Sequence, residues 1–134
     1  MNLRSAIALS GLVIASACTI GKSGKDLTVA SSPSGARISA KVPQSTVTGE
    51  LVAMGDNGMV VLSGAQLRFL PYALISSMTV SEFGPEYAVS SASPLSAQKR
   101  DRLRLISRFP QGMTPVIERV FLARLIQTAV DTVR

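Results

Sequence analysis

The chain has little of the side-chain chemistry that enzymes use most often. Its 134 residues include no histidine, no tryptophan and one cysteine, Cys18. A single cysteine excludes an intramolecular disulfide. Without histidine, a zinc site has few ligands available, and a serine nucleophile has no imidazole base. We therefore expect a protein that is not an enzyme and that holds no metal and no cofactor.

The acidic residues support the same expectation. The eight aspartates and glutamates are scattered and form no paired motif, and no G-x-S-x-G sequence is present. Asp56-Asn57 lacks the further oxygens and the distal glutamate of a calcium loop. The surrounding Gly55-Asp56-Asn57-Gly58 instead predicts a hairpin turn, because Asn and Gly both tolerate positive φ.

Most of the chain also has no net charge. Residues 18–96 contain five basic and five acidic residues, whereas residues 97–134 contain eight basic and three acidic ones. The excess positive charge downstream of Cys18 therefore lies in the last 38 residues. Such an asymmetry points to an anionic partner for the C-terminal segment, or to a basic surface that only faces water.

The first seventeen residues have the layout of a secretory signal. Met1 to Arg4 carries one positive charge, residues 5–17 carry none and are mostly apolar, and small residues precede Cys18. The apolar run ends near Ile20, which is short for a membrane span of about 20 residues. We predict a signal peptide at residues 1–17 that is removed from the mature protein.

Ala15-Ser16-Ala17-Cys18 resembles a bacterial lipobox, which signal peptidase II cuts before a lipid-modified cysteine. The resemblance implies that Cys18 becomes the acylated N-terminus and anchors the protein to a membrane. Position 15 is Ala rather than the usual Leu, and Ala15-Ser16-Ala17 also fits the A-x-A site of ordinary signal peptidase. Thr19 is not the Asp that marks inner-membrane retention, so the outer membrane is favoured, with the soluble periplasm as the alternative.

The rest of the chain divides into four parts. Residues 18–35, rich in Gly, Ser and Lys, predict an anchor and a flexible tether. Residues 36–81 predict five short strands, near 36–42, 47–54, 59–62, 65–70 and 74–80, with a helical turn at Pro71-Tyr72-Ala73. The predicted fold class is α+β: a small antiparallel five-stranded barrel or meander, followed by two C-terminal helices.

Residues 47–80 resemble the pattern of Sm-like small barrels. Gly49 stands where a glycine lets a bent strand curl, and Pro71-Tyr72 stands where one turn of helix joins the last two strands. Many Sm-like barrels bind RNA, but the signal sequence places this domain outside the cytoplasm. We therefore expect no nucleic acid as a partner unless the N-terminus stays unprocessed.

Residues 82–94 predict a linker, and residues 95–134 a basic two-helix segment packed on the barrel. The first helix should run from about Pro94 to Phe109, with Leu95, Leu105, Ile106 and Phe109 on one side and Leu103 at its edge. Arg100, Arg104 and Arg108 recur every fourth residue on the opposite side and form a possible docking face for anionic lipid or an envelope protein, or a solvated surface.

The second helix should begin at Thr114-Pro115, a good N-cap and first-turn pair, and run towards Arg134. Its apolar stripe predicts either core packing or a partner surface. The stripe consists of Val116, Val120, Ala123, Ile126 and Val130, broadened by Ile117, Phe121, Leu122, Leu125 and Val133. Together these features predict a non-catalytic cell-envelope lipoprotein with a structural, assembly or binding role.

Overall fold

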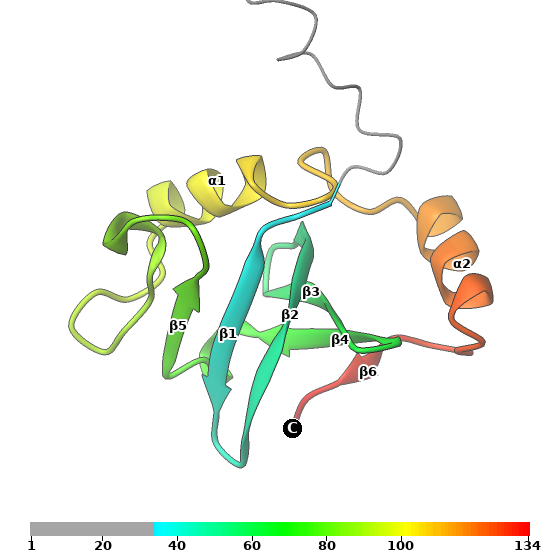
Figure 1. Ribbon diagram of the computed structural model, residues 1–134, viewed down its shortest axis with the longest axis horizontal. Coiled ribbons are helices and arrows are strands. Elements are labelled where there is room, and N and C mark those ends of the chain that lie inside the picture. Colours follow the sequence, from blue (N-terminus) through cyan, green and yellow to red (C-terminus); the bar gives the residue numbers. More distant parts are fainter. Residues whose placement is uncertain (1–33) are drawn as a thin grey trace, which may run out of the picture.

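The computed structural model describes residues 34–134. The predicted signal peptide at 1–17, the predicted lipid acceptor Cys18 and the predicted tether as far as residue 33 lie outside the described residues. In chain order the elements are β1 (Arg37–Val42), β2 (Ser45–Met54), β3 (Gly58–Ser63), β4 (Gln66–Pro71), the 3-10 turn η1 (Tyr72–Leu74), β5 (Ser77–Val80), the 3-10 turn η2 (Pro85–Tyr87), α1 (Ala97–Leu105), α2 (Pro115–Arg124) and β6 (Asp131–Thr132) (Figure 1). The α+β class, the five predicted strands and the helical turn after β4 are confirmed.

The strands form one mixed sheet in the order β5-β1-β2-β3-β4-β6. Neighbouring strands pair antiparallel, except that β6 pairs parallel with β4. The prediction of a five-stranded antiparallel barrel or meander is therefore correct in part: the strand number, the pairing of the last strand and the barrel alternative differ from it. A sixth strand is present, and within residues 34–134 the sheet has two edges, β5 and β6, so no barrel closes.

The long strand β2 is shared between two parts of this sheet. Its first half, up to Glu50, pairs with β1, whereas its second half, from Glu50 to Met54, pairs with β3. The register with β3 shifts between Leu51 and Ala53, so Val52 is an extra residue that bends the strand. This bend turns the two halves of the sheet away from each other.

The bulge also divides the core into two clusters. Leu51 and Met54 belong to the larger cluster with the inward residues of β1, Ile38, Ala40 and Val42, as their alternation predicts. Val52 and Ala53 belong to a smaller cluster with Leu67. Helix α1 covers the larger cluster through Leu103, and helix α2 covers the smaller one through Leu122.

The turn between β2 and β3 is where the sequence predicts it, but for a different reason. Among the described residues, the only glycines with positive φ are Gly64 and Gly112, and Asn57 does not have positive φ either. Gly58 is favoured because a Cβ atom there would overlap the Leu70 carbonyl and the Phe69 ring on β4. The glycine therefore permits a close strand approach rather than a left-handed turn.

The segment at 82–94, predicted to be a linker, is part of the fold. It contains η2, and Val89 is buried in the larger core cluster, where its backbone exchanges hydrogen bonds with Met78 at 2.8 and 2.9 Å. The aromatic rings of Phe83 and Tyr87 pack 5.0 Å apart. This segment therefore packs against the edge strand β5 through an isolated bridge.

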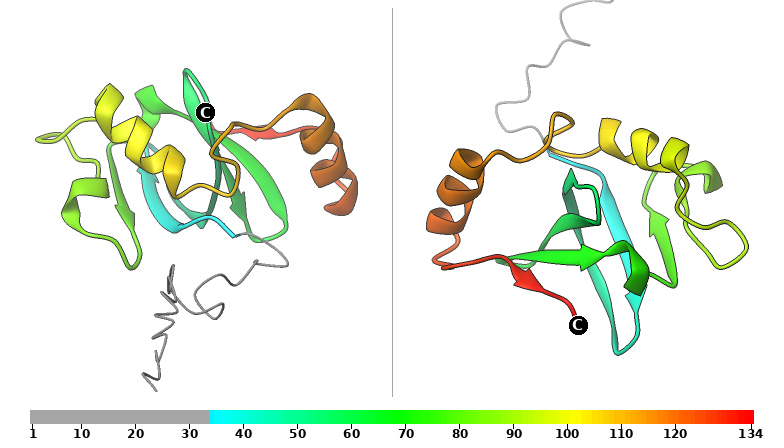
Figure 2. Two further views of the ribbon diagram at one scale, coloured as in Figure 1. Left: turned by 90° about the horizontal axis from the view of Figure 1, so that it is seen from above. Right: turned by 180° about the vertical axis from the view of Figure 1, so that it is seen from behind.

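Helix α2 begins as predicted, α1 begins at Ala97 rather than near Pro94, and both helices end earlier than predicted. Ser96 caps α1 by accepting from the backbone N–H of Lys99, and Thr114 caps α2 by accepting from that of Ile117. Helix α1 ends at Leu105 rather than Phe109, and α2 ends at Arg124 rather than Arg134. The chain after α2 instead returns to the sheet as β6. Figure 2 shows the two helices at the same end of the sheet, with the start of the described chain, drawn in cyan, between them.

Candidate functional site

The described chain begins at a cluster built by three distant segments. Glu50 on β2 accepts hydrogen bonds at Oε1 from the backbone N–H of Gly35 and from Arg108 Nε, both at 2.6 Å. Its Oε2 accepts from Arg108 Nη2, also at 2.6 Å. This bidentate pair is mostly covered, with 17% of the Arg108 side chain and 19% of the Glu50 side chain exposed. The ion pair therefore joins the entry of the chain to the loop between the helices.

Backbone contacts hold the same cluster together. The N–H of Ala36 donates to the Ile106 carbonyl at 2.8 Å, and the N–H of Arg108 donates to the Leu51 carbonyl at 3.0 Å. A Cβ atom on Gly35 would overlap the Leu51 carbonyl oxygen, so this approach requires glycine. The loop after α1 thus lies along β2 as an added strand-like segment, and it places the Arg108 guanidinium beside Glu50.

The electrostatics of the pair follow from this geometry. Burial raises the pKa of Glu50, but the hydrogen bonds from Arg108 and Gly35 and the positive charge of Arg108 outweigh it, so the pKa lies below the usual 4.5. The hydrogen bonds that Arg108 donates to Glu50 raise the pKa of Arg108 against a smaller opposing effect of burial. Both groups are charged at neutral pH, and each uses the other as its main partner.

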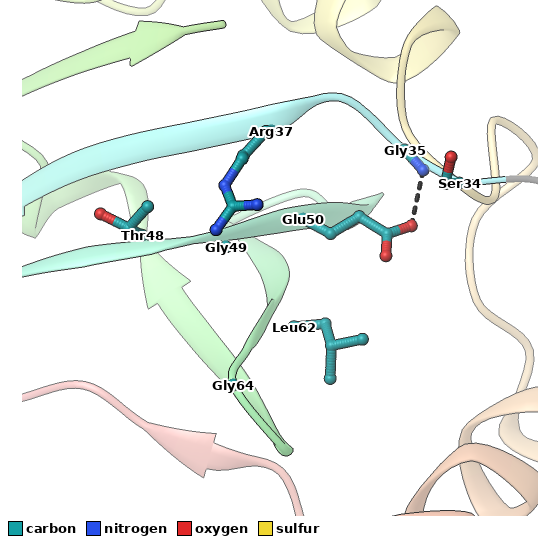
Figure 3. A pocket seen from close by; sticks show the side chains of 8 residues that line it. All are labelled: Ser34, Gly35, Arg37, Thr48, Gly49, Glu50, Leu62 and Gly64. Atoms are coloured by element: carbon teal, nitrogen blue, oxygen red, sulfur yellow. Dashed lines mark hydrogen bonds between the residues drawn. The ribbon is translucent and has the colours of Figure 1, made fainter.

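A surface hollow of about 390 Å³ lies beside the cluster (Figure 3). It is lined by Ser34, Gly35, Arg37, Thr48, Gly49, Glu50, Leu62 and Gly64. The Glu50 side chain is directed towards Gly35 (Figure 3). The exposed Arg37 is the residue opposite Glu50 on the neighbouring strand β1. The hydroxyls of Ser34 and Thr48 have no general base here, because the only carboxylate of the hollow is already bound to Arg108. The hollow therefore offers polar contacts but no catalytic pair.

The three arginines of the predicted docking face do not share one face. Arg100 and Arg104 lie on α1, whereas Arg108 follows the helix and is bound to Glu50. Arg100 donates to the Asp56 carbonyl at 3.3 Å and lies 5.9 Å from the centre of the Tyr72 ring. Arg104 lies 3.8 Å from the Asp101 carboxylate. Each of these arginines thus has a contact within the fold.

Tyr72 lies between two arginines of α1, Arg100 and Arg104, and the turn that joins β2 to β3. Its hydroxyl donates to the Gly55 carbonyl at 2.6 Å. Burial raises the pKa of Tyr72 above 10.0, and the nearby charges of Arg100 and Arg104 oppose that shift. The phenol is therefore protonated at neutral pH, as the hydrogen bond requires.

Helix α2 places most of its predicted apolar stripe outside the core. Val116 is 64% exposed, Val120 is 48% exposed and Ile126 is 96% exposed, and Ala123 is exposed as well. The residues that face the sheet come from the broadened part of the prediction, namely Leu122, Phe121 and Leu125. The core interpretation is therefore wrong for Val116, Val120, Ala123 and Ile126. It holds for Val130, which packs partly against the smaller cluster, and for Val133, which is buried in the larger one.

Metal-ligand groups and membrane-spanning helices are two further features that the described residues could show. Within residues 34–134, no three His, Cys, Asp or Glu side chains gather as metal ligands. No helix in that range is long and apolar enough to cross a bilayer. Comparison of the chain with protein-family models, curated proteins and solved structures finds no match.

Sequence reasoning missed the Glu50–Arg108 pair and left open whether the α2 stripe is core or exposed surface. The pair joins residues 58 positions apart, so no local spacing predicts it. A usable indication was present, because Glu50 is a charged residue inside a strand whose following four residues are apolar and buried. A charge in such a place needs a partner. The exposure of Val116 and Val120 had no such indication, because helical spacing does not say which of two apolar sides faces the sheet.

Proposed function

We propose that this protein is a lipid-anchored, non-catalytic module of the bacterial cell envelope. The acylated Cys18 holds it at the outer membrane on the periplasmic side, and the domain has a structural, assembly or binding role. The observation that carries the proposal is Ala15-Ser16-Ala17-Cys18 directly after an uncharged apolar run. Each buried methylene adds about 0.8 kcal/mol, so two or more acyl chains would hold the protein stably.

The position of the domain along the chain supports this arrangement. Fifteen residues, 19–33, separate Cys18 from the first described residue, Ser34. A fully extended segment of that length spans about 50 Å, because each residue adds about 3.3 Å. The domain can therefore reach partners at or near the membrane while the anchor stays in place. The occupied carboxylate of Glu50 is consistent with a role that needs no catalysis.

The first test is the intact mass of the protein purified from bacterial membranes, beside the variant Cys18→Ala. We expect the wild type to lack residues 1–17 and to carry the added mass of acyl chains, and the variant to carry none. The variant Thr19→Asp tests the location separately. On density-gradient fractionation it should move from the outer to the inner membrane, while the acylated mass stays the same.

Two results would overturn the anchor. A chain that is cut before Cys18 but not acylated would be a soluble periplasmic protein. An uncut chain in the cytosol would instead favour nucleic-acid binding of the Sm-like kind. In that case RNA affinity should fall steeply as salt increases.

A further inference from the structure

The outer face of α2 is apolar and bordered by positive charge. We define it as Val116, Val120 and Ala123 on the helix, together with Ile126, which is exposed just beyond the helix end. The first three follow helical spacing and lie on one side of α2, and a shallow hollow there is lined by Val116, Arg119, Val120 and Ala123. Arg119 borders the stripe on one side and Arg124 on the other, as 3.6 residues per turn requires. Neither arginine has an ion-pair partner among residues 34–134.

Ile126, just after the end of the helix, has an unusual backbone conformation for its residue type. It follows the C-cap Leu125 with a φ of 55°, in the left-handed region that a β-branched residue rarely adopts. The N–H of Gln127 donates to the Leu122 carbonyl at 2.9 Å and that of Ile126 to the Ala123 carbonyl at 3.3 Å. Glycine is the residue most common at this position of such a helix end. The chain instead exposes a large apolar side chain there, at a conformational cost.

A helix that is apolar on both sides is normally covered on both sides. The inner side of α2 packs on the smaller core cluster through Leu122, Phe121 and Leu125. The outer side has no cover within the described residues, and three of its four side chains are among the most exposed large hydrophobics of the fold. An external partner would supply the missing cover.

The bordering charges favour a membrane over a second copy of the chain. A two-fold symmetric pairing of this face would bring arginines close to arginines, and like charges oppose such contact. An anionic bilayer offers the complementary arrangement. Apolar side chains enter the region between headgroups and acyl chains, while arginines reach back to the phosphates.

The path of the chain favours the same partner. The segment that leads to Cys18 joins the domain between α1 and α2, at the end of the sheet opposite the β1–β2 turn (Figure 1). If Cys18 is acylated, α2 is always within reach of the bilayer that holds the anchor. Tethering raises the effective concentration of the face at that surface, so a weak interfacial contact is enough.

We propose that the outer face of α2 docks on the surface of the anionic bilayer that holds the Cys18 anchor, and so fixes the orientation of the domain. This inference rests on the proposed function. Val116, Val120, Ala123 and Ile126 supply the apolar contact, and Arg119 and Arg124 bind lipid phosphates. The turn between β1 and β2 then points away from the membrane.

The single cysteine makes a direct test possible. Once Cys18 is acylated, its thiol is blocked, so Val120→Cys provides one reactive thiol for an environment-sensitive fluorophore. Gln44→Cys, in the exposed turn between β1 and β2, is the matched control. The acylated protein is reconstituted in phosphatidylethanolamine vesicles with and without phosphatidylglycerol. We expect the probe at 120 to shift to shorter wavelengths and to be quenched by brominated acyl chains in the anionic vesicles, and the probe at 44 to stay in water.

Three substitutions separate charge from apolar contact. Arg119→Gln should lower the ratio of docked to undocked domain roughly fivefold, because each basic residue near an anionic surface contributes about 1 kcal/mol. Lys41→Gln, which removes an equal charge from β1, should leave it unchanged. Val116→Asp should abolish docking, because it puts a negative charge into the apolar face. The helix should be retained, because an acidic residue in the first turn interacts favourably with the helix dipole.

The possible failures are distinguishable. Labelling of the wild-type protein at Cys18 would show a free thiol and overturn the anchor itself. An acylated protein whose probe at 120 stays in water on anionic vesicles would overturn the docking proposal alone. Shielding of that probe without vesicles, increasing with protein concentration, would overturn it in favour of a second copy of the chain.

Discussion

The two helices lie at the same end of the sheet, have nearly the same length and carry equivalent hydroxyl N-caps, but they differ in how they use their surfaces. Helix α1 buries one leucine, Leu103, and its other side is charged. Helix α2 is apolar both towards the sheet and away from it. Helix α1 thus exposes one large apolar side chain, Leu105, whereas α2 exposes an apolar stripe along its outer side.

The arginines differ in the same way. Three of the four arginines in and just after α1 contact groups of the fold: Arg100 contacts Tyr72, Arg104 lies near Asp101, and Arg108 binds Glu50. Arg119 and Arg124 on α2 have no such acidic partner among residues 34–134. The basic excess of the last 38 residues therefore combines two uses, internal contacts near α1 and a free positive border on α2.

The largest expected effect tests α1 as a cover. Leu103→Ala removes a fully buried side chain from the larger core cluster and should lower the free energy of unfolding by about 3 kcal/mol, through lost burial and the cavity left behind. Leu105→Ala, two residues away but 76% exposed, should change it by less than about 0.5 kcal/mol. Urea unfolding followed by circular dichroism measures both. Equal losses would show that α1 packs differently.

The Glu50–Arg108 pair should give the next largest effect, and one that depends on pH. Arg108→Met should lower the free energy of unfolding by about 2 kcal/mol at neutral pH, because Glu50 loses its bidentate partner. Since the folded pKa of Glu50 lies below 4.5, the stabilisation is fully present above that pH and is lost as the pH falls through the folded value. Unfolding from pH 7 to pH 2 should show the two proteins converging in acid.

Two matched substitutions at the same site would sharpen that result. Glu50→Gln should remove most of the pH dependence that distinguishes the wild type from Arg108→Met. Arg37→Gln, on the neighbouring strand and with an exposed side chain, should keep the wild-type pH profile. A pH-independent difference between wild type and Arg108→Met would contradict an ionised Glu50 as the partner.

The strands were predictable because their information is local. Alternation in residues 36–42 and the turn residues near Asn57 define β1, β2 and β3 without knowledge of the rest of the fold. The ends of the helices were not predictable in this way. Helix α1 ends where the N–H of Ala36 donates to the Ile106 carbonyl and the chain begins to pair with the sheet. This contact joins residues 70 positions apart, so local spacing does not predict it.

The sixth strand shows the same limit. Residues 125–134 continue a helical apolar pattern, so helix was the better local interpretation. In the fold, the left-handed Ile126 ends α2 and Gln127 then binds β4 by its side chain. Both contacts of Gln127 are with Leu67, 60 residues earlier. The free arginine border and the exposed valines follow from this packing, which explains why the candidate membrane face emerged only from the structure.

Gln127 is therefore expected to hold α2 on the sheet. Its side chain accepts from the Leu67 N–H at 2.8 Å and donates to the Leu67 carbonyl at 2.9 Å, as a neighbouring strand would. Gln127→Met keeps the length but removes both hydrogen bonds, and should lower the free energy of unfolding by about 1.5 kcal/mol. Hydrogen exchange of the Leu67 amide should accelerate, while that of Leu51 in β2 should change only with global stability. No local change at Leu67 would contradict this role.

The smallest expected effect is the most informative about α2, because stability and docking should move in opposite directions. Ile126→Gly relieves the left-handed strain and should raise the free energy of unfolding by about 1 kcal/mol. For a domain of this size the melting temperature should rise by roughly 5 °C. The same change removes the most exposed apolar side chain of the outer face, so docking on anionic vesicles should weaken. Ile126→Ala is the matched control, which loses the apolar contact but gains no relief, since alanine also disfavours positive φ. A glycine variant that is more stable and docks as well as the wild type would show that the strain at Ile126 serves no membrane contact.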